Sequence, residues 1–251
     1  MSRTTRLRLF LTAAAVLAAA VLAAALIVAA EQLPGFGGAR HPYGERAVAA
    51  GLARQSANIV SAVNFDQRGF DTLGEESILF GSVLGAGMLL RLARDEHKRR
   101  PAAEPVLPTT RLFGATLLPL TLLTGGYLVA HGQLSPGGGF QGGVVLTTAL
   151  HLAYVAADYR VLKRIRPLAV LDVTDAIAAG SYAALGLIGL AQGAGYLANT
   201  LPLGTFNALS SSGLVAVINA AVGVEVGSAV VVLLAHFLDQ AVEVTPRRRN
   251  R

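Results

Sequence analysis

The chain of 251 residues contains no cysteine and few charged residues. Without cysteine it has no disulfide, no thiolate metal site and no cysteine-bound iron–sulfur cluster, which excludes the commonest single-chain redox roles. Charged residues make up 14% and hydrophobic residues 53% of the sequence. A soluble domain with so little charge could not cover its surface with polar groups, so the composition indicates an integral membrane protein.

The sequence also lacks the motifs of common catalytic sites. It has no Ser–His–Asp set with a supporting motif, no phosphate-binding loop and no His/Glu cluster at metal-ligand spacing. The glycine-rich run 137–143 does not follow a strand of a βαβ unit, so it is not a dinucleotide-binding fingerprint. We therefore predict that the protein is not an enzyme and holds neither a metal ion nor a cofactor.

Six apolar windows of about 20 residues predict transmembrane helices. They lie near residues 9–30, 74–93, 112–131, 141–158, 173–192 and 213–238. The formal net charge of +6 comes from clusters of Lys and Arg at both termini and in two loops, 91–111 and 160–166. Placing all four clusters in the cytoplasm satisfies the positive-inside rule. Both termini are then cytoplasmic, and the basic tail meets lipid headgroups rather than nucleic acid.

A charged, proline-rich segment, residues 95–110, predicts a cytoplasmic linker. It separates a two-helix module, residues 1–94, from a four-helix domain, residues 111–251. The run from Leu9 to Ala30 exceeds the roughly 7–15 residues of a signal-peptide core, so a retained helix is favoured over a cleaved signal. The predicted fold is all-α and membrane-integral, with about six transmembrane helices and one short amphipathic helix on the extracytoplasmic side.

A glycine-rich stretch, residues 131–143, joins the third and fourth predicted spans. Glycine permits φ > 0 and close backbone approach, and irregular backbone at membrane depth is tolerated only where it is buried in protein or lines a cavity. We therefore expect residues 135–143 to form an ordered turn or to pack against another subunit. The stretch resembles the signature loop of the B-type subunits of the Mrp-type (Mnh) multisubunit sodium/proton antiporters. The residues that carry the resemblance include His131, Pro136, Gly137, Gly138, Gly139, Phe140, Gln141, Gly142 and Gly143.

A second stretch, residues 58–76, precedes the second predicted span. It resembles a signature at the C-terminal end of the large, A-type subunits of the same antiporters, which also occurs in related small subunits of membrane-bound hydrogenases. Gln67 departs from this signature, which commonly has an aromatic residue there. The matching residues include Asn58, Asp66, Arg68, Phe70, Asp71, Thr72, Gly74 and Glu75.

The same region has recognisable local structure. Apolar residues recur at near-helical spacing from Ala47 to Val63, which predicts the amphipathic helix. Asp71 and Thr72 are suitable N-cap residues for the following span, and Glu75 and Glu76 would then lie in its first turn. A solvated helix cap accounts for Asp71 and Glu76. It accounts less well for the five charged residues at one membrane boundary, which are Asp66, Arg68, Asp71, Glu75 and Glu76.

Two ionisable residues fall near the centres of predicted spans, where a charge costs about 2.5–3.5 kcal/mol on insertion scales. Glu225 is either an ion or proton relay or a structural carboxyl group, and the sequence favours neither. For His151 a structural role is favoured. Glu75 and Asp71 are further ion-pathway candidates. Asp175 falls at a predicted cytoplasmic helix end, where we expect it to be solvated or paired.

The two resemblances imply a plasma-membrane component of a multisubunit sodium/proton antiporter. Its implied partners are large complex I-like subunits and small subunits, together with sodium ions, protons and the lipid bilayer. Such a component braces the large subunits and lines part of the ion route. The alternatives are the same module in a membrane-bound hydrogenase or oxidoreductase complex, and a purely structural assembly subunit with no ion pathway.

Overall fold

The computed structural model describes residues 3–33, 41–96, 106–157 and 168–238, and these residues form helices, turns and loops without a β-strand. Six of the helices are long and apolar enough to cross a membrane, which confirms the predicted all-α membrane fold. The six candidate spans are Arg8–Glu31, Gly69–Leu90, Pro108–Ala130, Gly139–Ala156, Ala169–Ala191 and Leu214–Phe237. The cytoplasmic placement of both termini stays a prediction.

The chain divides into two compact units, residues 1–44 and 45–251. In the first unit, helix α1 (Arg3–Glu31) has none of its candidate span buried. The hydroxyl of Thr12 donates to the Arg8 carbonyl at 2.9 Å, so this polar group is satisfied within the helix itself. The helix therefore presents an apolar surface suited to lipid.

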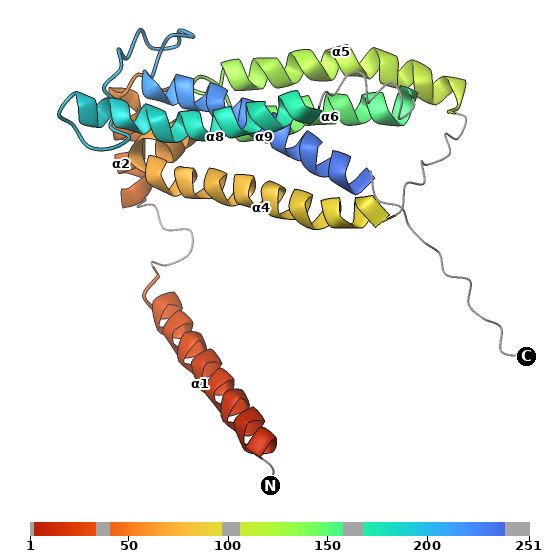
Figure 1. Ribbon diagram of the computed structural model, residues 1–251. Helices are drawn as coiled ribbons and strands as arrows, with labels where there is room; N and C mark the ends of the chain where they lie inside the picture. The colour runs from red at the N-terminus through yellow and green to blue at the C-terminus, as the bar shows by residue number, and fades with distance from the viewer. Residues whose placement is uncertain (1–2, 34–40, 97–105, 158–167, 239–251) are drawn as a thin grey trace, which may run out of the picture. The chain divides into compact units, whose positions relative to one another are not determined.

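Helix α9 (Leu214–Leu238) is the centre of the second unit. It packs against α4 (Gly69–Glu96), α6 (Gly139–Ala157) and α8 (Leu168–Ala191), as Figure 1 shows. About 56% of its candidate span is buried, whereas α4 buries 17%, so α9 is the helix around which the others are arranged. Its inward residues share a core with Phe65, with Tyr182 of α8 and with Leu197 of the loop between α8 and α9. The α9 members of this core are Leu214, Val215, Ile218, Val222 and Val226.

Glycines bring α6 close to its neighbours. A Cβ at Gly142 would lie 2.9 Å from the backbone nitrogen of Val129 in α5 (Pro108–Ala130), and one at Gly143 would lie 2.9 Å from the Gly223 carbonyl oxygen in α9. Small residues are the usual means of close helix packing in lipid, where no hydrophobic driving force acts between helices. The second half of the signature loop thus serves as the start of a tightly packed helix.

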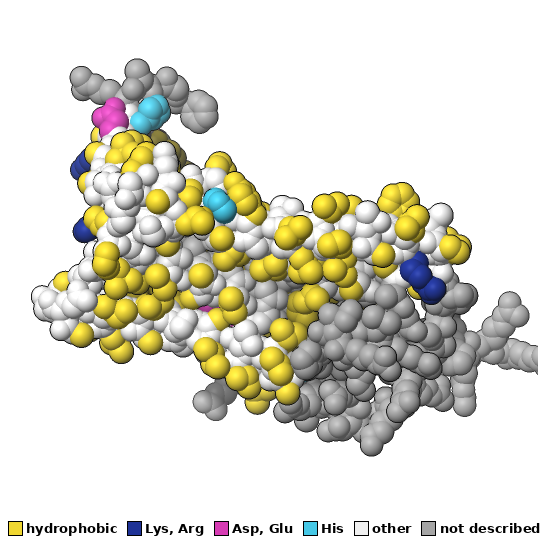
Figure 2. Space-filling model, turned by 90° about the horizontal axis from the view of Figure 1, so that it is seen from above, with side chains coloured by type: hydrophobic (Ala, Val, Ile, Leu, Met, Phe, Trp, Pro, Cys, Tyr) yellow, Lys and Arg dark blue, Asp and Glu magenta, His cyan; other side chains and the backbone are white. Residues whose placement is uncertain are grey.

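The outer surface of the helices is apolar. Figure 2 shows hydrophobic side chains spread along the helical body, with the visible Lys and Arg side chains toward its ends. Many large apolar side chains on α4 and α5 are more than half exposed, including Phe70, Ile78, Met88, Leu112 and Leu123. Such a surface requires lipid or the helices of partner subunits around it.

The predicted amphipathic helix over Ala47–Val63 is not continuous. Helix α2 (Pro42–Ala53) ends early, Gln55 takes a φ of +57°, and the chain resumes as α3 (Ile59–Ala62) and a π-helical turn, η1 (Val63–Gln67). The break frees the backbone N–H groups of Ala57 and Asn58 to bond the distant Gln133 carbonyl, so tertiary contacts override the local periodicity.

The second span also begins earlier than predicted. Helix α4 starts at Gly69, which places Asp71 in its first turn and Glu76 in its second. Thr72 is not an N-cap, because its hydroxyl donates to the Asn64 carbonyl at 2.7 Å. The predicted linker 95–110 and the basic clusters at 160–166 and 247–251 lie largely or wholly outside the described residues, so the predicted domain division stays a prediction.

Candidate functional site

The two signature stretches contact each other directly. The side-chain amide of Asn58 donates to the carbonyls of Gly132 at 2.7 Å and Ser135 at 2.8 Å. The backbone N–H groups of Ala57 and Asn58 both donate to the Gln133 carbonyl. Asn58 also caps α3, because its side-chain oxygen accepts from the Ser61 N–H. Asn58 of the first of these stretches, residues 58–76 (the front stretch), thus holds the glycine-rich loop between α5 and α6.

Asn219 of α9 contacts both the glycine-rich loop and the front stretch. Its side-chain oxygen accepts from the Gly139 N–H at 2.9 Å, and its side-chain nitrogen donates to the Ser61 hydroxyl at 2.7 Å and to the Val215 carbonyl. Asn219 is fully buried and all its strong hydrogen-bonding groups are used. It therefore links the two stretches to α9.

The glycines of the loop are required by this arrangement. Gly137 and Gly138 have φ values of +124° and +136°, in the region that glycine alone adopts without strain. A Cβ at Gly138 would lie 2.8 Å from the side-chain oxygen of Asn219. The stretch is an ordered turn that packs against other parts of the same chain. At its start, the His131 ring stacks on Tyr127 with centroids 4.0 Å apart.

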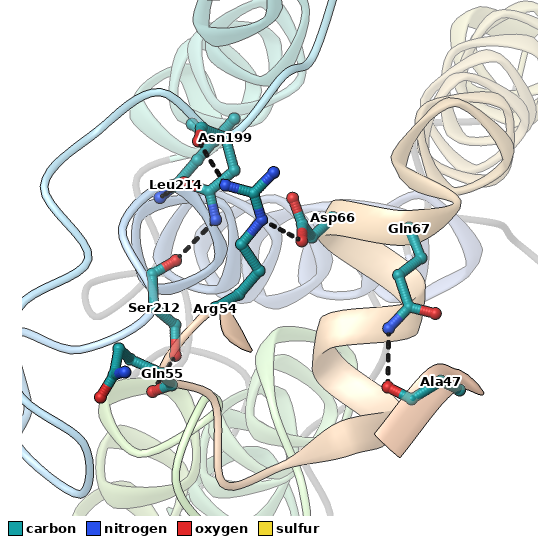
Figure 3. Close-up of polar contacts among 8 residues, drawn as sticks. All are labelled: Ala47, Arg54, Gln55, Asp66, Gln67, Asn199, Ser212 and Leu214. Carbon is teal, nitrogen blue, oxygen red and sulfur yellow. Dashed lines mark hydrogen bonds and ion pairs between the residues drawn. The ribbon is translucent and has the colours of Figure 1, made fainter. Parts of the chain in front are cut away.

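A second polar cluster ties the front stretch to the loop between α8 and α9 (Figure 3). Arg54 lies 3.5 Å from the Asp66 carboxylate and donates to the Asn199 carbonyl at 3.4 Å. Asn199 in turn bonds the carbonyl of Ser212 and the N–H of Leu214, which fixes the start of α9. This cluster and the signature loop lie at the same end of the helices, so we call them together the polar cap.

Asp66 is the titratable group of the polar cap. Its side chain is 10% exposed, and burial raises the pKa of Asp66 above its usual value of 3.8. The positive charge of Arg54 and a contact with Asn199 both act to lower this pKa, but burial is the larger effect. The Arg54–Asp66 pair is therefore a weak, pH-sensitive connection between the front stretch and the α8–α9 loop.

Below the polar cap, three helices bring carboxyl groups together in the apolar interior. Glu76 of α4 and Glu225 of α9 lie against each other, and Asp175 of α8 is a further acidic neighbour of both. Their exposed fractions are 1%, 0% and 4%. Both carboxyl oxygens of Glu76 and of Glu225, and one of Asp175, have no hydrogen-bond partner of standard geometry. Buried polar groups are normally paired, so this carboxyl cluster requires a proton, a cation or a partner that completes it.

The three carboxyl groups lie at a similar level of the helices, which run roughly side by side with α8 antiparallel to the other two (Figure 1). A Cβ at Gly87 of α4 would lie 3.0 Å from the His236 ring of α9, and Glu76 and Glu225 precede these two residues by the same distance along their helices. Leu171, one turn before Asp175 in α8, packs against Val83 of α4 and against α9. The cluster is thus one group enclosed between the three helices.

The other predicted ion-pathway residues lie elsewhere. Glu75 and Asp71 are exposed on the outer surface of α4, and Asp71 forms an ion pair with Arg68. His151 of α6 is partly buried, and its Nε2 has no hydrogen-bond partner among the described residues. Of the four predicted residues, only Glu225 belongs to the carboxyl cluster.

Sequence reasoning missed Glu76 and Asp175. The expectation of a solvated cap at Glu76 is wrong, because this residue is buried against Glu225. The expectation of a solvated Asp175 is also wrong, because Asp175 is buried two turns inside α8. The basic residues with which it was expected to pair lie outside the described residues. The acidic pair Glu75–Glu76 was a partial signal, since two adjacent residues on a helix point about 100° apart and so meet different surroundings. Among the described residues, no group of three His, Asp or Glu side chains has the spacing of a metal site.

Six apolar helices with buried acidic groups between them define a multi-pass membrane protein. Residues 109–232 match the family model described as a domain related to the MnhB subunit of Na+/H+ antiporters. Over these residues the chain is similar to that domain.

Two curated proteins are similar to the chain. An uncharacterised protein of Methanocaldococcus jannaschii is 26% identical over 198 residues, which are 67% of this chain and 72% of that protein. A probable K+/H+ antiporter A/B protein of Rhizobium meliloti is 29% identical over 136 residues, which are 44% of this chain and only 14% of that protein.

Two solved structures share the fold. A chain of the archaeal membrane-bound sulfane sulfur reductase, a respiratory membrane complex, superposes with a TM-score of 0.69 and 29% identity. The match covers 90% of this chain and 97% of that one. A chain of the Mrp complex from Dietzia sp. DQ12-45-1b superposes with a TM-score of 0.62 and 22% identity, over 98% of this chain and 27% of that one. At that identity the second likeness shows the fold alone.

Proposed function

We propose that the protein is a component of a multisubunit cation/proton antiporter and that its carboxyl cluster forms part of the ion or proton route. The MnhB-related domain and the similarity to a probable K+/H+ antiporter protein support the assignment to such a complex. In this proposal the chain is a transport subunit rather than an enzyme. Its partners are the large complex I-like subunits and the small subunits of the complex, in the plasma membrane.

The observation that carries the proposal is the set of unpartnered carboxyl groups gathered in the apolar interior. An ionised carboxylate in an apolar interior is strongly disfavoured unless a positive charge neutralises it. Two carboxyl groups side by side repel each other when both are ionised, and a proton or cation between them removes the repulsion. Glu76, Glu225 and Asp175 thus form a series of positions that each favour a positive charge.

Glu225 is the central member of this series. It contacts Glu76 on one side and is an acidic neighbour of Asp175 on the other. We assign Glu225 the transfer of a proton or cation between the other two. Sodium is the expected cation, and the K+/H+ name of one relative makes potassium the second candidate to assay. Asp71, Glu75 and His151 stay predicted ion-pathway residues without a contact to the cluster.

The test is Glu225→Gln in the assembled complex. Glutamine keeps the volume and hydrogen-bonding capacity of glutamate but cannot take up or release a proton. We expect normal assembly with loss of most cation-dependent antiport in membrane vesicles, and partial activity in Glu225→Asp. Glu45→Gln, an exposed position outside the candidate spans, is the matched control and should retain full activity. Full antiport by Glu225→Gln across the pH range would indicate a purely structural role.

A membrane component of a related oxidoreductase complex is the second candidate. The superposition on a chain of the sulfane sulfur reductase, which covers 97% of that chain, favours it. Purification in mild detergent separates the two assignments. Partners that resemble only ion-translocating membrane subunits support the antiporter, whereas a co-purifying soluble redox protein supports the oxidoreductase complex.

A further inference from the structure

A hollow borders the carboxyl cluster on one side. Between α4 and α8 there is a hollow of about 290 Å³, and Glu76 is among the residues that line it. The walls are formed by small and apolar side chains together with one hydroxyl: Leu73, Ser77, Phe80, Ala176, Ala179 and Gly180. A Cβ at Gly180 would meet no atom within 4 Å, so this side of the hollow is uncovered.

Lipid alone is a poor occupant of this hollow. Both carboxyl oxygens of Glu76 lack a hydrogen-bond partner of standard geometry, although the residue is only 1% exposed and lies against Glu225. An acyl chain would fill the apolar walls but offer these oxygens no partner, and an unsatisfied polar group costs several kcal/mol in a bilayer. An occupant that brings a donor or a positive charge to the floor of the hollow removes this cost.

The described part of the chain does not supply that charge. Within it, the charged neighbours of Glu76 are the acidic residues Glu225, Glu75 and Asp175. The three candidate spans that surround it, Gly69–Leu90, Ala169–Ala191 and Leu214–Phe237, contain no Lys or Arg. Among the described residues, all charge that faces the hollow is thus acidic.

We infer that the hollow between α4 and α8 receives a basic side chain from a transmembrane helix of another subunit. The hollow opens sideways between two spanning helices, within their apolar portions. A neighbouring helix packed along α4 and α8 therefore reaches it directly, and its apolar residues cover Leu73 and Phe80. A lysine fits the requirement well, because its aliphatic stem matches the apolar walls and its ammonium group matches the carboxylate. This docking surface goes beyond the proposed transport role and requires only that the chain assembles with other membrane subunits.

The first test fills the hollow. Gly180→Leu projects a side chain into open space and should displace the incoming residue without a clash inside the chain. Loss of a buried charged contact is large enough that we expect at least a tenfold decrease in retention of one partner subunit, equivalent to about 1.4 kcal/mol. Gly81→Leu is the control, since Gly81 also has no atom within 4 Å of its Cβ position and does not line the hollow. Equal recovery of all partners with both variants overturns the inference.

The second test identifies the occupant and is independent of the leucine variants. A photoreactive benzoylphenylalanine at position 180, in the complex in native membranes, is irradiated and the linked peptide is sequenced by mass spectrometry. A linked transmembrane peptide of another subunit, with Lys, Arg or His within one helical turn of the linked residue, supports the inference. Linkage to lipid only, or to a peptide without a basic residue, overturns it and leaves a small cation or proton at Glu76. Antiport by Glu225→Gln is measured separately, so failure here does not decide the proposed function.

Discussion

Replacing Asn58 with Asp separates two roles of this residue. As a helix N-cap, aspartate is as good as asparagine, so capping of α3 alone predicts no loss of stability. The contact with the signature loop requires a hydrogen-bond donor at position 58. The Asn58 side-chain nitrogen donates to two carbonyl oxygens, of Gly132 and Ser135, and a carboxylate at that position has no hydrogen to donate.

The magnitude follows from these two contacts. Each buried carbonyl left without its donor costs about 1–3 kcal/mol, so partial relaxation of the loop gives about 3 kcal/mol in total. For a chain of 150–250 residues, 1 kcal/mol corresponds to about 2–4 °C, so the midpoint of unfolding should fall by about 6–12 °C. Asn58→Ala should cost less, because a methyl group does not repel the two carbonyl oxygens.

The assay is thermal unfolding of the purified protein in mild detergent, followed by circular dichroism at a helix wavelength. Asn207→Asp is the matched control, because Asn207 is exposed and aspartate tolerates its φ of +63°. The difference between the unfolding midpoints of Asn58→Asp and the unsubstituted protein should narrow at acidic pH, where a protonated carboxyl group regains one hydrogen-bond donor. A midpoint for Asn58→Asp equal to that of the unsubstituted protein would refute the assignment of Asn58 as the holder of the loop.

Two further predictions concern the loop and the polar cap. The Gly138→Val protein should insert into the membrane but give a lower recovery of the complex, because a Cβ at position 138 meets Asn219 and the φ there is +136°. Gly126→Val, at an open position, is the control. Equal recovery of the complex with both variants would mean that the loop glycines serve only as a flexible connector. The pKa of Asp66 is raised, so its contribution to stability is fully present below about pH 3.8 and is lost as the pH rises through its folded-state pKa. Arg54→Gln removes the charge that lowers this pKa, so the stability loss should extend to higher pH than in the unsubstituted protein. Parallel pH profiles of the two unfolding midpoints would contradict that coupling.

The six spans are predictable because uninterrupted apolar windows of about 20 residues have few other uses in proteins. The glycine-rich loop is predictable for a similar reason, since irregular backbone near a membrane must be covered by protein. Both predictions depend on the composition of a segment and not on which side of it faces a neighbour.

The carboxyl cluster depends on which side of each helix faces the neighbouring helices, and the sequence does not predict it for that reason. The windows placed the second and fifth spans too late, near residues 74 and 173, whereas α4 and α8 begin at Gly69 and Leu168. Glu76 and Asp175 therefore counted as boundary residues although both lie in the second helical turn or deeper. The outer surface of α4 is as apolar as the inner one, so periodicity gives no signal that Glu76, and not Glu75, points toward α9.

The contacts through Asn58 and Asn219 join residues that are 74 to 158 positions apart in the sequence. The groups that form these contacts belong to the front stretch, the signature loop and α9, and none of them lies in the segment 95–110. Two separate polypeptides divided within that segment would carry the same complementary surfaces and could associate through them. The two halves can therefore be encoded by one gene or by two without a change in their contact residues. Fusion or separation of the genes at this point alters how the halves are inserted into the membrane and not the contacts that they form there.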